Sequence, residues 1–576
     1  MSKKKSSNAN WIESTLERAI QHHKQNQLTQ AEELYRAILQ KQPRHAHALH
    51  CLGLIAQRTR HYDMAEQLIL RSIEEDPAFA MYYSNLGALF IEQNKFEPAI
   101  QSLNKAIRLK PDYADAMANL GKAWHSLQRL TEAADWYRKA IDINPTLAEA
   151  YNGLGSVLHA QNDYQGAIEN FQHATRIHPR FVAAYSNLAV TYGELRQYDN
   201  VISCCQKVIE LEPDQAENYQ HLGLACQELG QLPMSEGFFQ RALALKPQNP
   251  NYHWGLGLTR LAMGKLDQGW TGYEYRWQKI DPITRQNFPY PIWQGENLPD
   301  KTILVWGEQG IGDQIMFASM YNDVLPRFRK TVFACAAKLV SLYARSFPQA
   351  DVVALENTER LSGYDSGIDV QSAAGSLTRW LRPEVSSFPR DEFYLMPDPQ
   401  RVRYWKDRLA SLGPELNVGI CWRSGNMTGN RSLYCSSLEQ WGAIFAINGV
   451  RFINLQYDEC EGELTRARQL FGTAIHGFPE VDLYNDIDEA AALTRAMDMV
   501  ISAPTAAGIL AAAVGVPTWV MTSGFNWQKF GTAENCWYGT LHSFDKSWVQ
   551  DWDVIIEKVA HQLQHYRDAS RLNPAE

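Results

Sequence analysis

The chain has 576 residues, several times the usual size of one domain, so more than one hydrophobic core is expected. Apolar residues make up 45% and charged residues 21%, which excludes a wholly disordered, collagen-like or disulfide-scaffold protein. The net charge of −9 offers no basic field that would attract nucleic acid or anionic lipid.

Residues 12–283 carry a 34-residue period, which predicts eight repeated units after a flexible N-terminal tail over 1–11. Leu-Gly, Ala, an aromatic residue and Pro recur at fixed positions of the unit. Small residues let two helices approach closely, large residues fill the gap, and Pro ends the second helix. We therefore expect stacked helix–turn–helix units forming an α superhelix. The prolines are Pro43, Pro77, Pro111, Pro145, Pro179, Pro213 and Pro247.

This period matches the tetratricopeptide repeat (TPR) pattern, whose arrays bind extended peptides on a concave face. On that face we expect an acceptor-binding row of asparagines, because repeated carboxamides can pair with the backbone of a strand-like ligand. Exposed polar residues that are merely tolerated there would give the same pattern. The O-GlcNAc transferases carry a similar row. Its members here are Asn85, Asn119, Asn152 and Asn187.

After a predicted linker at 284–300, the period gives way to short strands alternating with glycine turns and helices. Two such sets, over 301–400 and 401–576, predict an α/β fold with two Rossmann-like lobes and a cleft between them. A closing helix is expected at 548–566. The aromatic segment 269–277 is expected to join the repeats to the first lobe.

A glycine-rich loop, Gly307 to Asp313, follows the first predicted strand. It is neither a Walker loop nor a true G-x-G-x-x-G motif, so it indicates only a close backbone approach at a helix N-terminus. Asp313 can cap that helix, which contributes about 1 kcal/mol, or it can take part in chemistry.

Several stretches within 301–525 resemble the family-nine-like GT-B glycosyltransferases, which include the lipopolysaccharide heptosyltransferases. The stretches are 306–318 (WGEQGIGDQIMFA), 418–425 with Arg431, 452–456, and the donor-type strand and helix 498–519. The resemblance implies a GT-B fold, a nucleotide-sugar donor, no metal requirement, and Asp313 as the catalytic base.

The chain departs from the heptosyltransferases in the donor helix. They carry Asp-Thr and then His four residues later, whereas this chain has Pro504-Thr505 and then Ile509. ADP-heptose is therefore not expected as the donor. The Pro-Thr form behind a repeat array is similar to bacterial TPR-containing GT-B transferases that modify flagellin with nonulosonic (sialic-acid-like) sugars. That similarity implies a CMP-sugar donor.

Candidate donor-binding residues lie at predicted helix N-termini and strand ends. Free N–H groups at residues 505–508 can bind a leaving phosphate, although the small side chains there would also suit plain packing. Arg423 and Arg431 can offset negative charge or be ordinary surface arginines. Trp527 can contact the donor or belong to a core. The set is Gly310, Gly312, Gln314, Arg423, Ser424, Gly425, Arg431, Gln456, Pro504, Thr505, Ala506, Ala507, Gly508, Asn526 and Trp527.

Together these features predict a protein O-glycosyltransferase whose repeats recruit a protein acceptor such as flagellin. It would transfer a nonulosonic sugar from CMP to Ser or Thr without a cofactor. One alternative is a TPR adaptor or chaperone with an inactive transferase half. Another is a lipopolysaccharide glycosyltransferase, which gives no reason for eight peptide-binding repeats. With no apolar leader, no bilayer-length apolar run and no C-x-x-C pair among nine cysteines, we expect a cytoplasmic protein.

Overall fold

A computed structural model describes residues 2–279, 288–355, 367–389, 393–425, 427, 433–548 and 550–572. The chain divides into two compact units, residues 1–213 and 214–576, and each is described by itself.

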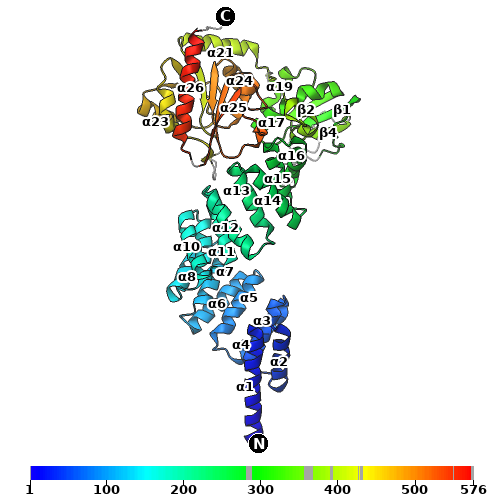
Figure 1. Cartoon of the computed structure of the whole chain (residues 1–576), viewed down its shortest axis with the longest axis vertical. Coiled ribbons are helices and arrows are strands. Elements are labelled where there is room, and N and C mark those ends of the chain that lie inside the picture. Colours follow the sequence, from blue (N-terminus) through cyan, green and yellow to red (C-terminus); the bar gives the residue numbers. More distant parts are fainter. Residues whose placement is uncertain are drawn as a thin grey trace. The chain divides into compact units, whose positions relative to one another are not determined.

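The described part of the first unit consists of twelve helices that pack as successive antiparallel pairs (Figure 1). They are α1 (Ser2–Lys24), α2 (Leu28–Lys41), α3 (Ala46–Arg58), α4 (Tyr62–Glu75), α5 (Ala80–Glu92), α6 (Phe96–Leu109), α7 (Ala114–Ser126), α8 (Leu130–Ile143), α9 (Ala148–Ala160), α10 (Tyr164–Ile177), α11 (Val182–Glu194) and α12 (Tyr198–Leu211). Helix α1 includes most of the predicted tail, because neither Gly nor Pro interrupts the sequence before Lys24.

The repeated glycines let the two helices of a pair approach closely. A Cβ on Gly87 of α5 would lie 2.5 Å from Leu103 of α6, and one on Gly155 would lie 2.7 Å from Phe171. The large residue of each second helix therefore occupies the space that the glycine leaves free. This confirms the predicted roles of the small and large repeat positions.

Each turn within a pair passes through the left-handed region at one residue, which reverses the chain between the two helices. These residues also recur every 34 positions. In the first unit they are Asn26, Arg60, Asn94, Gln128, Asn162 and Arg196, and in the second unit Gly230 and Gly264.

The second unit begins with two further repeat pairs, which complete the predicted eight. They are α13 (Ala216–Glu228), α14 (Leu232–Leu245), α15 (Pro250–Ala262) and α16 (Leu266–Tyr273), followed by the 3₁₀ helix η1 (Glu274–Gln278). Leu261 and Trp270 lie in the same core as the first sheet, and Trp270 Nε1 donates to the Arg382 carbonyl at 2.8 Å. The predicted aromatic junction is therefore present.

The predicted linker at 284–300 is partly built into the fold. Residues 284–287 lie outside the described residues, but Trp293 is buried and its backbone N–H donates to the Gln371 carbonyl at 2.8 Å. The first strand already begins at Leu298. The boundary between compact units falls after Pro213 instead. The last repeat shares a core with the sheets, and Glu228 of the repeat before it accepts hydrogen bonds from the Phe525 N–H at 2.9 Å and from Trp548 Nε1 at 3.0 Å.

Two parallel sheets form the rest of the second unit, in the orders β3-β2-β1-β4 and β10-β9-β8-β5-β6-β7. The strands are β1 (Leu298–Trp306), β2 (Phe328–Cys335), β3 (Asp351–Ala354), β4 (Val370–Ala373), β5 (Leu416–Cys421), β6 (Val450–Asn454), β7 (Ile475–His476), β8 (Met499–Ser502), β9 (Thr518–Ser523) and β10 (Leu541–Lys546). The described pairings are all parallel, as alternating strands and helices predict.

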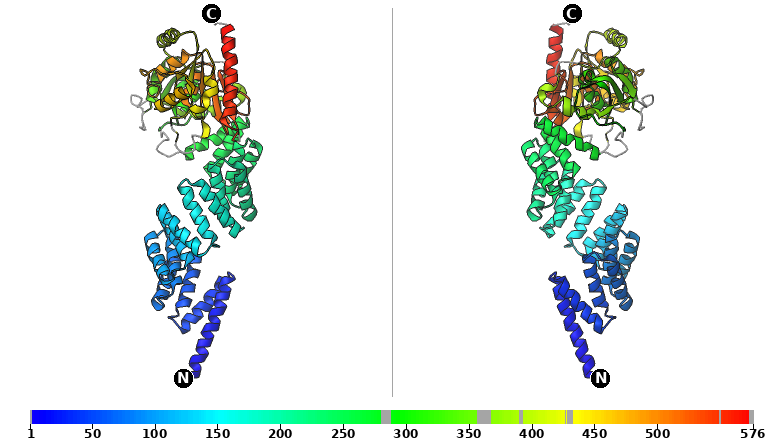
Figure 2. Two further views of the ribbon diagram at one scale, coloured as in Figure 1. Left: turned by 90° about the vertical axis from the view of Figure 1, so that its left-hand side faces the viewer. Right: turned by 90° about the vertical axis from the view of Figure 1, so that its right-hand side faces the viewer.

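Helices connect and cover these strands. They are α17 (Ile311–Ala318), α18 (Tyr321–Val324), α19 (Val340–Ser346), α20 (Thr378–Leu381), α21 (Pro399–Ser411), α22 (Gly442–Phe445), α23 (Glu461–Phe471), α24 (Ile487–Arg495), α25 (Ala506–Ala513) and α26 (Trp552–Leu572). The closing helix α26, red in Figures 1 and 2, buries Ile555, Val559 and Leu563 in a core with strands of the second sheet. Short 3₁₀ helices are η2 (Leu325–Arg327), η3 (Ala337–Leu339), η4 (Ala374–Leu377), η5 (Val385–Ser387), η7 (Leu438–Trp441) and η8 (Trp527–Lys529).

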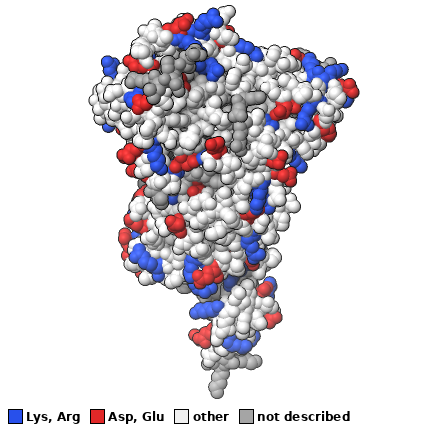
Figure 3. Space-filling model, turned by 45° about the horizontal axis from the view of Figure 1, so that its top comes forward, with Lys and Arg blue, Asp and Glu red and all other residues white. Residues whose placement is uncertain are grey.

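On the face shown in Figure 3, acidic and basic side chains are interspersed, in keeping with the moderate net charge. Within the described part of the chain, no helix combines the length and the apolar character that crossing a bilayer would need.

Two glycines of the second unit provide a matched test of helix packing. A Cβ on Gly257 of α15 would lie 2.7 Å from backbone atoms of Gly272 in α16, whereas a Cβ on Gly237 of α14 would meet nothing within 4 Å. We expect Gly257→Ala to destabilise the protein by about 1–3 kcal/mol, because backbone must move. Gly237→Ala should stabilise it by about 0.5–1 kcal/mol through helix propensity. Urea unfolding measures both changes in stability. Equal changes for the two variants would contradict the close contact of α15 with α16 at Gly257.

Candidate functional site

A pocket of about 390 Å³ lies in the second unit where carboxyl ends of strands from both sheets face each other. The loops after β1, β5 and β8 reach it. In each sheet these loops lie where the strand order changes direction, which is where parallel sheets usually bind ligands. The predicted site residues that line it are Gly310, Gly312, Asp313, Ser424, Pro504, Thr505, Ala506 and Asn526.

Two helix N-termini, those of α17 and α25, meet at this pocket. A Cβ on Gly312 of α17 would lie 3.2 Å from Ile509 and 3.6 Å from Ala506 of α25. Glycine and alanine thus let the two helices approach closely. Both helix ends bring N–H groups and a partial positive charge to the same cavity, an arrangement that favours an anion.

Asp313 lies in the first turn of α17 and is half-buried at the pocket. Its Oδ2 accepts a hydrogen bond from the Gly310 N–H at 3.2 Å, so it does help to cap the helix. Burial raises the pKa of Asp313 above its ordinary value, against the lowering effect of the Gly310 hydrogen bond, and nearby Glu308 adds to the rise. A carboxylate with a raised pKa is a stronger base.

The N-terminus of α25 has no side-chain cap. Thr505, its N-cap residue, is buried, and its hydroxyl lies 3.1 Å from Ser502 Oγ and 3.4 Å from Cys421 Sγ. The threonine side chain therefore bonds toward the sheet. Gly508 serves packing, since a Cβ there would lie 3.0 Å from Ser502.

Arg423 does not line the pocket. Its guanidinium is held by Glu463, with Nε 2.9 Å from Oε2, and by an ion pair with Asp458. The predicted role of Arg423 in offsetting phosphate charge is therefore not supported, because two carboxylates already neutralise it. Arg431, the other predicted arginine, lies outside the described residues.

Other predicted donor residues lie around the pocket without lining it. Gln456 is buried and donates to the Arg423 carbonyl at 3.0 Å, and the Gly425 N–H donates to the Tyr457 hydroxyl at 3.1 Å. Gln314 Oε1 accepts from the Ala336 N–H at 3.0 Å, which fixes the loop after β2. Trp527 packs edge-on against Trp270 with ring centroids 5.9 Å apart, so it belongs to the aromatic junction.

A second pocket of about 340 Å³ shares residues Gly310, Ile311, Tyr457 and Ala506 with the first and is also lined by Ala507. Lys338 lies in it and was not predicted. Its ammonium group donates to the Tyr484 carbonyl at 2.9 Å and lies 4.0 Å from the centre of the Tyr484 ring. Lys338 is thus a cation next to the two helix N-termini.

The loop that carries Asp313 is anchored by a buried ion pair that sequence reasoning missed. Glu308 accepts two hydrogen bonds of 2.8 Å from the Arg276 guanidinium, and the Gly375 N–H donates to the same carboxylate at 2.7 Å. Gln309 donates to the Tyr273 hydroxyl at 3.1 Å. Tyr273 is the last residue of α16 and Arg276 lies in η1 directly after it, so the end of the repeat array holds the loop that carries Asp313.

The predicted acceptor residues belong to the first unit, where they are half-buried on first helices of the repeat pairs. Asn187 donates to Asn152 Oδ1 at 3.0 Å, linking neighbouring repeats, and Asn85 pairs with His50 at 2.8 Å. Asn119 occupies the equivalent place on α7. Part of the expected row is thus already paired within the protein.

Family models described as tetratricopeptide repeat or TPR repeat match residues 16–80 and 84–148, 136–169, 155–195 and 182–215. The chain therefore contains a tetratricopeptide-repeat array, a protein-interaction domain.

A curated relative, Protein FlbA of Caulobacter vibrioides, is 32% identical over 322 residues, covering 53% of this chain and 53% of that protein. The chain thus spans about half the length of the relative it matches. Among solved structures, the APC/C hetero-tetramer Cut9-Hcn1 is similar at 18% identity with a TM-score of 0.39, covering 42% of this chain and 48% of that one. MamA is similar at 26% identity with a TM-score of 0.27, covering 28% and 95%.

Proposed function

We propose that the protein is an O-glycosyltransferase that binds a protein acceptor through its repeats and transfers a nonulosonic sugar from CMP to a Ser or Thr hydroxyl. The observation that carries the proposal is the pocket between the two sheets, where Asp313 and the uncapped N-terminus of α25 meet. A base and an anion site in one cavity are what transfer from a nucleotide sugar requires.

Asp313 is the proposed base. Gly310 engages one carboxylate oxygen, which fixes the side chain and leaves the other oxygen for an acceptor hydroxyl. In the step, the hydroxyl oxygen bonds to the anomeric carbon as that carbon's bond to the CMP phosphate breaks. The hydroxyl proton passes to Asp313, and the electron pair leaves with CMP.

The leaving phosphate is assigned to the N–H groups at the start of α25. Pro504, Thr505 and Ala506 line the pocket, and the small side chain of Ala506 allows phosphate oxygens to reach the backbone. Lys338, in the adjoining pocket, replaces Arg423 as the proposed cation for a phosphate or sugar carboxylate, because Arg423 is neutralised by Glu463 and Asp458.

The protein acceptor, for which flagellin is the candidate, is assigned to the repeat array. Support comes from the TPR matches and from Asn85, Asn119 and Asn187, which occupy equivalent places on first helices of the repeat pairs, with Asn152 one residue earlier on its own helix. The first unit holds all four asparagines, so the proposal separates acceptor capture by the first unit from chemistry in the second.

The test is to incubate the purified full-length protein with flagellin and a CMP-activated nonulosonic sugar and to measure the intact mass of flagellin. We expect the mass to rise by whole sugar residues and the release of CMP to match. If no nucleotide sugar adds mass, the transferase proposal fails.

A second candidate function, a TPR adaptor with an inactive transferase half, is favoured by the missing Asp and His of the donor helix at Pro504 and Ile509. The same experiment separates the two functions. Tight flagellin binding without transfer would support the adaptor, while transfer excludes it. A lipopolysaccharide acceptor would instead yield product with lipopolysaccharide and none with flagellin.

A further inference from the structure

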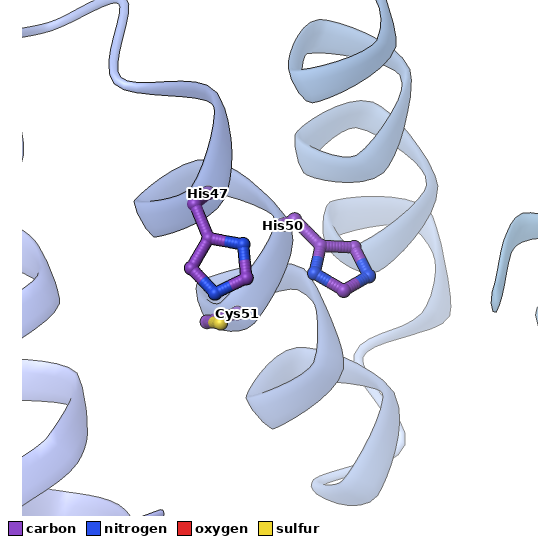
Figure 4. A group of neighbouring side chains, drawn as sticks. All are labelled: His47, His50 and Cys51. Carbon is purple, nitrogen blue, oxygen red and sulfur yellow. The ribbon is translucent and has the colours of Figure 1, made fainter. Parts of the chain in front are cut away.

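Two histidines and a cysteine gather on one face of α3, in the second repeat pair of the first unit. His47, His50 and Cys51 are spaced so that i, i+3 and i+4 positions meet on a helix. One ligand-type atom from each side chain lies within 4.8 Å of the others. Figure 4 shows the two imidazole rings side by side with the sulfur at the edge of the His47 ring.

Within this cluster, His50 is buried with one ring nitrogen that lacks a hydrogen-bond partner in the described part of the chain. Its side chain is 1% exposed, yet its Nδ1 has no hydrogen-bond partner among the described residues. A buried ring nitrogen without a partner is unfavourable unless a ligand completes its bonding. Nδ1 is also the nitrogen that the rest of the structure leaves available.

The other ring nitrogen of His50 already has a positioning partner from the next repeat. Nε2 lies 2.8 Å from the side-chain amide of Asn85 on α5. Histidine ligands usually give their second ring N–H to an oxygen, and a flip of the Asn85 amide would present Oδ1 at this place. The histidine would then bind through Nδ1 and donate through Nε2.

Aromatic rings enclose the cluster on the side of α5. The His50 ring packs on Tyr82 with centroids 4.7 Å apart, and His47 lies 6.3 Å from Phe79 and 6.4 Å from Tyr82. The Tyr35 hydroxyl lies next to the Cys51 thiol. These contacts restrict the motion of the two imidazole rings on that side.

We propose that His47, His50 and Cys51 form a binding site for a thiophilic divalent cation, of which Zn²⁺ is the representative. Two imidazoles and a thiolate are a preferred zinc donor set, and three protein ligands leave a fourth position for water or another ligand. A tetrahedral ion with bonds of about 2.0–2.3 Å holds its ligand atoms about 3.3–3.8 Å apart. Side-chain rotations that close the 4.8 Å separations by about 1 Å would reach that geometry.

The site requires the thiol to give up its proton to solvent when the metal binds, because the zinc ligand is the thiolate. This site has no C-x-x-C pair, because one cysteine is combined with two histidines on a single helix turn, and cysteine spacing alone therefore does not reveal it. The inference is independent of the proposed transfer chemistry, which involves other residues in the second unit. Asn85 alone is shared with the proposed function, because it also belongs to the asparagine row assigned to the acceptor.

The experiment titrates the reduced, metal-free full-length protein with Co²⁺ and then competes with Zn²⁺. We expect one tight equivalent, tetrahedral Co²⁺ absorption and a thiolate-to-cobalt band that Zn²⁺ displaces. Cys51→Ser should remove the thiolate band and weaken Zn²⁺ binding by at least about tenfold, and His50→Gln should weaken binding similarly. Cys205→Ser, at another buried cysteine of the array, is the matched control and should bind as the parent does.

Two further variants test the arrangement without removing a ligand. Asn85→Ala should weaken Zn²⁺ binding about 10–100-fold, and Asn85→Asp should retain or strengthen it. The proposal is overturned if the parent binds no Zn²⁺ at micromolar concentrations, or if the Co²⁺ band survives in Cys51→Ser. If Cys51→Ser fails to fold, the opposite effects of the two Asn85 variants decide the matter, and equal affinities would refute the site.

Discussion

Replacing Asp313 by Asn should slow sugar transfer about 10²–10⁴-fold, the usual effect of losing a general base. Asparagine has nearly the same shape, and its Oδ1 can still accept from the Gly310 N–H, so α17 should keep its cap. Only the ability to take a proton is lost. Turnover of flagellin with a saturating CMP-sugar measures the effect, and acceptor binding should be unchanged.

Asp553→Asn is the matched control, because Asp553 lies in the first turn of α26 and does not line the pocket. Its turnover should equal that of the parent protein. If Asp313→Asn turns over at the parental rate, Asp313 is a capping residue and the proposed mechanism is wrong.

Replacing Arg276 by Met should destabilise the second unit by about 3–5 kcal/mol, because it leaves the Glu308 carboxylate buried without its cation. Arg276 and Glu308 are each at most 5% exposed and share two hydrogen bonds of 2.8 Å. Although burial acts to lower it, the pKa of Arg276 is raised by Glu308 and Glu274, so the guanidinium stays charged. Urea unfolding followed by tryptophan fluorescence gives the change in free energy.

An exposed ion pair of the same unit provides the control. Arg466 contacts Glu439 at 3.2 Å, and its side chain is 66% exposed, so Arg466→Met should change the free energy of unfolding by less than about 1 kcal/mol. The double variant Arg276→Met with Glu308→Leu should recover much of the lost stability, since no charge stays buried alone. An equal, small effect of both single arginine variants would contradict the role of the buried pair.

The repeat architecture could be predicted from the sequence because the units use the same packing, in which a small residue of the first helix faces a large residue of the second. The spacing of Gly87 and Leu103, for example, recurs with other residues of similar size, so one unit explains the rest. The unit boundary after Pro213 could not be predicted in this way. It depends on which repeats contact the rest of the second unit through core packing or hydrogen bonds, and the period is the same on both sides of it.

Strands β4 and β10 are polar or irregular in pattern, so apolar runs do not predict them. In β4, the buried Gln371 accepts from Trp306 Nε1 at 2.7 Å and donates to two carbonyls, so its polar side chain is satisfied inside the fold. Strand β10 lies at the edge of the second sheet, and its sequence mixes buried apolar residues with the exposed polar residues His542 and Asp545. Helix α21 did have a readable signal, because Asp398 before Pro399 is an N-cap pattern.

Among the site residues, some positions could be predicted from the sequence and others could not. Asp313, Thr505 and Ala506 follow strand ends, and parallel strands bring such positions together, so their meeting could be predicted. The state of Arg423 could not, since its partners Asp458 and Glu463 lie 35 and 40 residues away in sequence. Glu308 likewise finds Arg276 only through the packing of the last repeat on the first sheet.

The last two repeats are built into the second unit, and this determines where a chimaera with a different acceptor could be joined. A junction near residue 284 would separate Trp270, Tyr273 and Arg276 from the sheet that they support. A junction after Pro213 leaves those contacts intact and exchanges six repeats together. If the proposed function holds, a junction after Pro213 is therefore the place at which acceptor binding can be exchanged while the candidate site stays whole.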